Sequence, residues 1–482
     1  MVFMFAGSLA LLCLIGYWAG RRVDSASDFF LAGRTLPAWA VVLSFVAAEI
    51  SAMTVVGVPA VAYRDNWQFL QFFIGSACAR IVVAFLFIPA FYRLDCTTIY
   101  DFLQERFGAA TRTAAALLFF VTRILASSVR LMAACAIVSG LLGWSIVSVL
   151  VVFCAVGIGY IAWGGIRAVV WTGVAQTLVV AAAALAVAGF LAASVEGGIG
   201  EVLRLAESAG RLELWKWGPG DAGVARGLLA DPNILWVALI TGFFGSLAAF
   251  GTDHEMMQRV LTVRTRLGSQ KAMILTMVVS FVVLVLYLAV GTGLFVFYDQ
   301  HPEMALPRDA DGILPHFALQ ILPEWRRGLV LAAIVMASID LPLASLGTVF
   351  VNDLYRPWFR PEADERHLLR VTRASAGAFG VLLAVVAFAL SVGGGWLWLA
   401  FKIGGVTYGP LLGVFVYGLL SRRKAGPAAA WAMGAATLLC WALLVLSENG
   451  RLPLGWHWLP FVGTAVTAVL TRLLSPAADA AP

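Results

Sequence analysis

The chain has 482 residues, of which 61% are hydrophobic and only 12% are charged, and its mean hydropathy is +0.90. This composition excludes a soluble globular domain and predicts a protein that crosses a membrane several times. The net charge of +6 does not call for nucleic acid as a partner, because the basic residues gather in loops between apolar runs.

The apolar runs have the length of membrane-spanning helices, since about 20 residues of helix cross roughly 30 Å of hydrocarbon. We therefore expect an all-α polytopic membrane protein with about thirteen spans. No linker divides the chain, so residues 1–482 are expected to form a single transmembrane domain. The expected spans lie near 2–20, 37–62, 67–93, 112–142, 146–163, 168–195, 233–255, 271–298, 327–353, 368–390, 396–420, 427–446 and 456–474.

The basic loops predict the orientation, because Lys and Arg concentrate on the cytoplasmic side of a membrane. With the N-terminus outside, most of the 33 Lys and Arg residues fall in inner loops. These loops include "GRRVDS", "RVLTVRTRLGSQK", "YRPWFRPEADERHLLR" and "SRRKAG". The C-terminus is then cytoplasmic, and the protein is expected in the cell (inner) membrane.

Glycines and a proline mark two spans where a helix could be interrupted. The second span contains Gly57 and Pro59, and the seventh contains Gly242, Gly245 and Gly251. Interrupted spans five apart are what an inverted repeat of five plus five helices produces, with a binding site near the midplane. Glycines that only permit close helix packing explain the pattern equally well.

The chemistry of the chain points to transport and not to catalysis. The six cysteines have no metal-ligand spacing, and no nucleotide-binding loop is visible. We therefore expect no enzyme activity and no cofactor. Charged residues inside spans are costly and count as functional candidates; they are Glu49, Arg80, Arg123, Arg130, Asp253, Asp340 and Lys402.

Six motifs in order along the chain carry a resemblance to a known family. They are "SDFFLAGRTLPAW", "ISAMTVVGVP", "GGIRAVVWTGVAQ", "TDHEMMQRVL", "TVFVNDLY" and "TYGPLLG". Together they resemble the sodium/solute symporter family, which includes bacterial proline, galactose and sialic acid symporters. The resemblance covers about residues 25–424. It implies a LeuT-type inverted repeat with core repeats of about 37–195 and 233–420, one extra helix before them and two after. It also implies sodium-driven uptake by alternating access.

The resemblance implies a sodium site between the second and ninth spans. Backbone carbonyls at the positions of Ala47 and Ile50 hold sodium in the family, and Ile334 offers a third carbonyl. Ala337 and Ser338 stand where the family has two hydroxyl residues, so one hydroxyl is missing. Because a hard cation takes several oxygen ligands, this loss should weaken the site.

A second ion site is implied at Asp340. Gly173 stands where the family motif normally has Asp, and Asp340 supplies a carboxylate on the ninth span instead. We interpret Asp340 as a relocated cation or proton site. The alternative is that Asp340 stabilises a kink before Pro342.

The resemblance also implies substrate contacts. Ser51, Thr54 and Gln71 match contact positions of sialic acid symporters, although the two hydroxyls could equally bond only to the backbone. Arg123 lies roughly where those symporters place an arginine that receives the substrate carboxylate, with Arg130 as the competing choice. Ser246 and Lys402 stand at sugar-contact positions of galactose symporters, but the pattern there departs from the family and disfavours galactose.

Glu49 needs a separate explanation, because it interrupts an apolar run. At 100° per residue, Ala47, Ile50, Ser51 and Thr54 share one helix face, and Glu49 points elsewhere. We interpret Glu49 as the partner of a buried cation that also shapes the break in the second span.

These inferences lead to one preferred function with alternatives. The preferred function is a sodium-coupled symporter that imports a small organic anion, an acidic sugar or a carboxylate. A proton-coupled relative that uses Asp340 or Glu49, and a sodium symporter for a neutral sugar or an amino acid, remain open. A channel-like or receptor-like use of the fold is disfavoured, because no signalling domain or continuous polar lining is visible. The expected partners are the solute, Na+ and the lipid bilayer.

Overall fold

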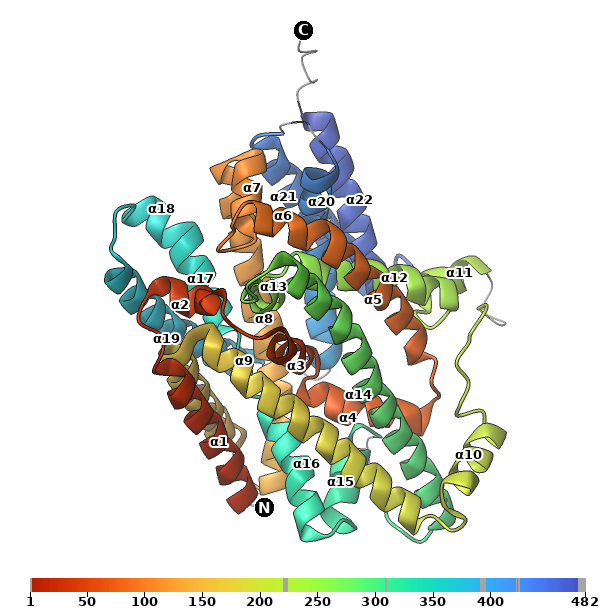
Figure 1. Cartoon of the computed structure of the whole chain (residues 1–482). Helices are drawn as coiled ribbons and strands as arrows, with labels where there is room; N and C mark the ends of the chain where they lie inside the picture. Colours follow the sequence, from red (N-terminus) through yellow and green to blue (C-terminus); the bar gives the residue numbers. More distant parts are fainter. Residues whose placement is uncertain are drawn as a thin grey trace.

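A computed structural model describes residues 2–219, 224–307, 310–390, 396–421, 423 and 425–475. Arg422 and Lys424, which belong to one of the expected inner loops, lie outside the described residues. The described chain is helical, with one isolated bridge between Leu36 and Val263. Its helices (Figure 1) are α1 Val2–Gly20, α2 Ala26–Leu31, α3 Ala38–Glu49, α4 Ala52–Arg64, α5 Phe69–Val82, α6 Ile88–Arg93, α7 Tyr100–Phe107, α8 Ala109–Leu142, α9 Ile146–Ser194, α10 Gly198–Ser208, α11 Val224–Ala230, α12 Leu235–Gly251, α13 His254–Leu261, α14 Arg266–Gln300, α15 Ile313–Gln320, α16 Glu324–Met336, α17 Leu343–Val349, α18 Arg356–Phe359, α19 Glu365–Ala389, α20 Trp396–Leu420, α21 Ala428–Glu448 and α22 Leu459–Leu474.

Among the described helices, nine are long and apolar enough to cross a membrane, or ten if the bent pair α3 and α4 counts as one span. Three of the about thirteen spans expected from the sequence do not appear as separate long helices. The fifth and sixth expected spans form α9, whose 49 residues turn at Gly165 with φ of 53°. The ninth is divided between α16 and α17, and the last is α22 with only 16 residues.

The first broken helix lies in the second expected span, but the break comes before Gly57 and Pro59, the residues that marked it in the sequence. Helices α3 and α4 meet at an angle of 66°. Ile50 and Ser51, between them, have extended backbone. Pro59 lies further on, inside α4, so it does not itself form the break.

The second broken helix corrects part of the sequence prediction. Helix α12 continues through Gly242 and Gly245 and ends at Gly251. Asp253 then caps α13, and its carboxylate accepts a hydrogen bond of 3.0 Å from the backbone N–H of Glu255. The interruption therefore depends on a capping aspartate. Gly242 instead permits close packing of α12 against α5, because a Cβ at Gly242 would lie 3.2 Å from the carbonyl carbon of Phe72.

A third break was not expected as a loop. The span predicted at 327–353 is interrupted from residue 337 to 342, between α16 and α17. Tyr160 of α9 donates a hydrogen bond of 3.2 Å to the carbonyl of Ile339 in this loop. The loop thus lies in the interior, where its backbone groups need partners from neighbouring helices.

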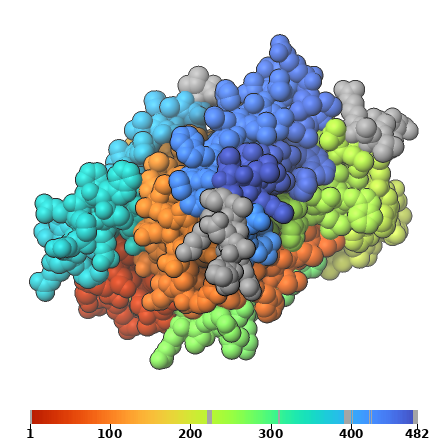
Figure 2. Space-filling view, turned by 90° about the horizontal axis from the view of Figure 1, so that it is seen from above, coloured from red at the N-terminus to blue at the C-terminus, as the bar shows by residue number. Residues whose placement is uncertain are grey.

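The helices run between two ends of the molecule, with the start of α1 at one end and the end of α22 at the other (Figure 1). Helix α1 lies against α9 near one edge, and α20 packs against α8, α21 and α22. Seen from the C-terminal end, α18 and α19 (turquoise) lie at one side of the C-terminal helices (blue), with α7 (orange) between them (Figure 2). The three breaks all lie inside this bundle.

Candidate functional site

The first and third breaks face a common cavity of about 30 Å³. Helices α8 and α13 complete its wall. Pockets that hold organic ligands are typically about 300–1,000 Å³, so these helices must move apart before a solute can enter. The polar residues that line the cavity are Ser51, Ser127, Arg130, Glu255, Ser338 and Asp340.

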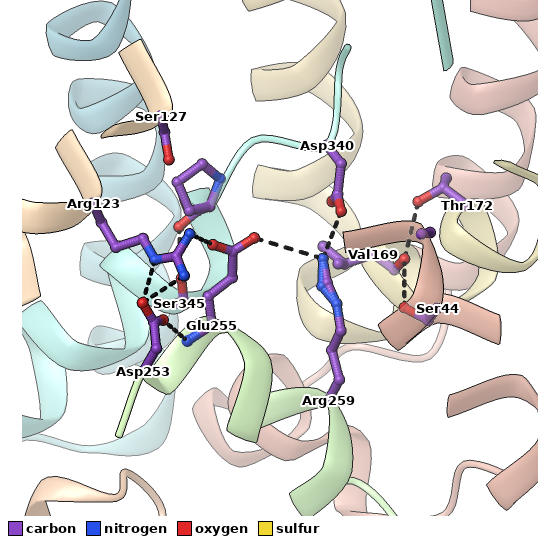
Figure 3. Close-up of polar contacts among 12 residues, drawn as sticks. Ser44, Arg123, Ser127, Val169, Thr172, Asp253, Glu255, Arg259, Asp340 and Ser345 are labelled. Carbon is purple, nitrogen blue, oxygen red and sulfur yellow. Dashed lines mark hydrogen bonds and ion pairs between the residues drawn. The ribbon is translucent and has the colours of Figure 1, made fainter. Parts of the chain in front are cut away.

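A line of alternating charges joins α8, α13 and the loop of the third break (Figure 3), and two of its members, Glu255 and Asp340, line the cavity. Arg123 of α8 pairs with Asp253, Nε to Oδ2 at 2.7 Å, and with Glu255, Nη1 to Oε2 at 2.5 Å. Arg259 of α13 lies 3.8 Å from the other oxygen of Glu255 and 2.7 Å from Oδ2 of Asp340. Because uncompensated buried charges are very costly, this line holds α8, α13 and the loop of the third break in register.

Arg123 and Arg130, the two candidates for a substrate carboxylate, have different surroundings. The guanidinium of Arg123 is buried between Asp253 and Glu255 and also lies 3.3 Å from the hydroxyl of Tyr408. Arg130 lines the cavity, and its one hydrogen bond within the described chain is to Ser127 at 3.3 Å. The structure therefore places Arg123 in the charge line and Arg130 at the open space.

Glu49 pairs with Arg80 of α5, whose side chain is fully buried. The other carboxylate oxygen of Glu49 accepts a hydrogen bond of 2.5 Å from Ser280 of α14. Arg80 in turn donates to Thr276 at 2.8 Å and stacks 4.5 Å above the ring of Phe250. Glu49 thus points away from the cavity and ties α3 to α5 and α14 beside the first break.

The expected sodium ligands lie on both sides of the cavity. Ala47, Ala337 and Ser338 line it. The hydroxyl of Ser338 donates a hydrogen bond of 2.5 Å to the carbonyl of Ile334. The carbonyls of Ala47 and Ile50 accept hydrogen bonds from Gln176 of α9, at 3.0 and 3.4 Å.

The argument that placed four residues on one helix face does not apply, because α3 ends at Glu49 and α4 begins only at Ala52. Ser51 lines the cavity, whereas Thr54, beyond the break, is not among the lining residues. Gln176 was missed by the sequence analysis. It is the last residue of the motif "GGIRAVVWTGVAQ", and a polar side chain in an apolar span was the available signal.

Three other expected substrate residues are not among those that line this cavity. Gln71 donates a hydrogen bond of 2.8 Å to the carbonyl of Asn233 and accepts one of 3.1 Å from the N–H of Lys216, so it ties α5 to the loop before α12. The ammonium of Lys402 pairs with Glu448 at 2.6 Å. Ser246 is buried within α12.

Gly173 has a packing role of its own. A Cβ at this position would lie 2.8 Å from the Cα of Ser44, so α9 and α3 could not approach as closely with a larger residue. Ser44 also donates a hydrogen bond of 3.4 Å to the carbonyl of Val169 (Figure 3). An aspartate at 173 would therefore require α9 and α3 to move apart.

Broken helices around a central polar cavity, with irregular backbone inside the bundle at the breaks, are the features of a secondary transporter of the LeuT type. The model of the Sodium:solute symporter family matches residues 29–435. The chain therefore belongs to the sodium:solute symporter family. It is a multi-pass membrane protein and a sodium-coupled solute symporter, not an enzyme.

Individual relatives agree with this family. The chain is 29% identical to the sodium/sialic acid symporter NanT of Aliivibrio fischeri, over 97% of this chain and 91% of the relative. It is 28% identical to the human sodium-coupled monocarboxylate transporter 1, over 86% of this chain and 68% of the relative. A solved structure described as the substrate-bound outward-open state of a Na+-coupled sialic acid symporter superposes with a TM-score of 0.86, covering 98% of both chains at 23% identity, and so shares the fold.

Proposed function

We propose that this symporter imports a small organic anion together with Na+, and that Arg130 receives the carboxylate of the solute. The observation that supports this most directly is the position of Arg130 at the cavity, with one long hydrogen bond to Ser127. A guanidinium binds a carboxylate through two parallel hydrogen bonds. Ser51 at the first break and Ser127 of α8, which also line the cavity, offer hydroxyl groups to the rest of the solute.

The charges around the cavity explain why such an anion needs a cation. Three arginines, Arg123, Arg130 and Arg259, face three carboxylates, Asp253, Glu255 and Asp340. Because this network is formally neutral, an incoming carboxylate adds a net negative charge. A sodium ion that enters beside it removes that imbalance, so the two binding events favour each other.

We place this sodium ion between the first and third breaks. Its proposed ligands are the carbonyls of Ala47, Ile50 and Ile334, the backbone of Ala337 and the hydroxyl of Ser338. The carbonyl end of α3 carries partial negative charge, which favours a cation there.

Asp340 is the proposed second ion site, for a cation or a proton. One of its oxygens bonds to Arg259, and Oδ1 is buried with no hydrogen-bond partner within the described chain. We also propose that the whole chain acts as one transport domain in the cell membrane, with its N-terminus outside and its C-terminus in the cytoplasm.

Counterflow uptake in proteoliposomes tests the substrate class. The solute panel contains a sialic acid, short monocarboxylates, a neutral hexose and a zwitterionic amino acid, each with and without Na+. We expect uptake of a carboxylate-bearing solute that depends on Na+. Uptake of only the neutral hexose or the amino acid would contradict an anionic substrate, and uptake driven by a proton gradient without Na+ would favour the proton-coupled alternative.

Two matched variants test the role of Arg130. Arg130→Lys keeps the charge but loses the two-pronged geometry, so we expect the KM for the anion to rise at least tenfold, which corresponds to about 1.4 kcal/mol. Arg451→Lys is the control, because Arg451 lies in the loop after α21, away from the cavity. An unchanged KM in folded Arg130→Lys would remove Arg130 from the substrate site.

A further inference from the structure

Gln176 occupies an unusual position for a glutamine in a membrane-spanning helix. Its side chain is only 3% exposed, and Nε2 donates hydrogen bonds of 3.0 Å to the carbonyl of Ala47 and 3.4 Å to the carbonyl of Ile50. Both carbonyls belong to the turn where α3 ends, so a continuing helix does not satisfy them. One amide nitrogen therefore bonds to the two carbonyls that the break leaves without helical partners.

The same two carbonyls are proposed ligands of Na+. Each carbonyl oxygen has two lone pairs, but an amide hydrogen bonded to it directs its positive end toward a cation bound there, so the N–H group and the ion oppose each other. In the arrangement that the structure shows, the amide hydrogens supply the positive charge that the carbonyl end of the helix attracts. Binding of the ion would therefore favour a rotation that moves this nitrogen away.

Glutamine can change its role without leaving the site. The terminal torsion of its side chain is broad and roughly two-fold, so a half-turn exchanges the nitrogen for the oxygen at little cost. An amide oxygen is a suitable ligand for a hard cation. The proposed site also needs such an oxygen, because Ala337 has no side-chain oxygen and hard cations take about six ligands.

We propose that Gln176 is a sodium ligand with two states: its amide nitrogen bonds to Ala47 and Ile50 when the ion is absent, and its amide oxygen binds the ion when it is present. This inference rests on the proposed sodium site. Because Gln176 belongs to α9, the half-turn also couples this helix to binding of the ion. Hydrogen bonds from Thr177 to the carbonyl of Leu43, at 2.7 Å, and from Ser44 to that of Val169 hold α9 against α3 while it occurs.

The test measures equilibrium binding of radioactive Na+ alone to purified full-length protein. Gln176→Leu removes the oxygen and the donor while nearly preserving volume. Thr177→Val is the matched control, because it removes a hydrogen bond between the same two helices without touching the proposed ligands. We expect Gln176→Leu to raise the dissociation constant for Na+ at least tenfold and Thr177→Val to change it less than threefold.

A purely structural amide predicts the opposite result. If Gln176 only bonds to the two carbonyls, its removal frees them, and Na+ should bind to Gln176→Leu as tightly as to the parent protein or more tightly. That result overturns the inference. A parent protein that binds no Na+ overturns both this inference and the proposed site. If Na+ binds more weakly to Ser338→Ala but as tightly to Gln176→Leu as to the parent protein, only the role of Gln176 is overturned.

Gln176→Glu provides a second test of the ligand role in case Gln176→Leu does not fold. This variant keeps an oxygen at the same reach and adds a charge, and it can carry a proton. We expect Na+ to bind at least as tightly as in the parent protein at high pH and more weakly as the pH falls, because the proton and the ion then compete for the carboxylate. Sodium binding to this variant that is weakened at every pH would contradict a ligand role.

Discussion

The roles of buried charges in this symporter depend on how many partners each one already has. Arg123 and Arg259 each contact carboxylates from other parts of the chain, so a solute would have to compete with fixed protein groups for them. Arg130 has one long contact to a hydroxyl and faces the cavity. The unused hydrogen-bond donors of Arg130 at the cavity are therefore the reason that we propose Arg130, and not Arg123, for the solute carboxylate.

Ser338 provides the residue-scale prediction for sodium. Its hydroxyl is the only side-chain oxygen among the proposed ligands at the third break. We expect Ser338→Ala to raise the Na+ concentration for half-maximal uptake by roughly 10- to 150-fold, because a hydrogen bond or contact to a charged group contributes about 1.5–3 kcal/mol. A sodium titration of uptake in proteoliposomes measures this shift.

The control for that experiment is Ser345→Ala. Ser345 is a buried serine of α17 that donates a hydrogen bond of 2.9 Å to the carbonyl of Pro342, and it does not line the cavity. We expect its sodium dependence to match the parent protein. Equal titration curves for both variants and the parent would show that Ser338 does not contact the ion.

At the scale of helices, close packing of α5 against α12 holds the second break in place. Gly75 and Gly242 lie at this contact, where an added Cβ would meet backbone atoms of the facing helix. Gly245, one turn from Gly242, would meet no atom within 4 Å. The glycines of α12 thus differ in role although the sequence presents them alike.

This difference predicts that alanine at the two glycine positions changes the free energy of unfolding in different ways. We expect Gly242→Ala to lower the free energy of unfolding by about 1–3 kcal/mol, because an overpacked helix contact must shift backbone. Gly245→Ala should be neutral or stabilise by up to about 1 kcal/mol, because alanine favours helix and has room. Thermal unfolding of both purified variants, followed by intrinsic fluorescence, measures the two effects. Equal losses of stability would contradict the packing role of Gly242.

The helices also show what the sequence could and could not predict. Long apolar runs predicted most spans, because the thickness of the membrane fixes their length. In the seventh expected span the helix ends at Gly251, one of three glycines that the sequence could not rank, and in the second span the break comes before Gly57 and Pro59. Near Pro342 only a kink was considered, because the apolar residues before it carry no strong local signal for a loop. Partners such as Glu49 and Arg80, or Gln176 and Ala47, are joined only by tertiary packing, which no local pattern records.

At the scale of the whole molecule, the start of α1 and the end of α22 lie at opposite ends of the bundle (Figure 1). This arrangement agrees with an odd number of crossings. The excess of basic residues in loops near the C-terminal end predicts that this end is cytoplasmic. Two exposed positions at opposite ends test the orientation, Ser208 on α10 and Arg264 before α14.

We expect a membrane-impermeant maleimide to label Ser208→Cys in intact cells and Arg264→Cys only after lysis. The background replaces the exposed Cys13 and Cys78 with serine and keeps the four buried cysteines. Burial raises the pKa of Cys96, in the loop after α6, to about 12. Since the reactive thiolate forms only as the pH approaches that pKa, Cys96 should stay unlabelled at neutral pH. Labelling of Arg264→Cys in intact cells would reverse the orientation.

Because the charge network is formally neutral, its charge affects how many cations accompany the solute through the whole transport cycle. A change of charge at Asp340 tests this dependence. In Asp340→Asn the network carries one extra positive charge, so the anion is balanced with one coupled cation fewer. We therefore expect reversal-potential measurements in proteoliposomes to give a ratio of coupled cations to solute that is lower by one than in the parent protein. Asp231→Asn is the control, because Asp231 pairs with Lys216 in the loop before α12, outside the cavity.

Gradients of Na+ and of pH, varied separately, identify the lost cation: a change only under sodium gradients indicates Na+, and a change only under pH gradients indicates a proton. Identical ratios for Asp340→Asn and the parent would mean that Asp340 serves only to neutralise Arg259 and to hold the third break against α13.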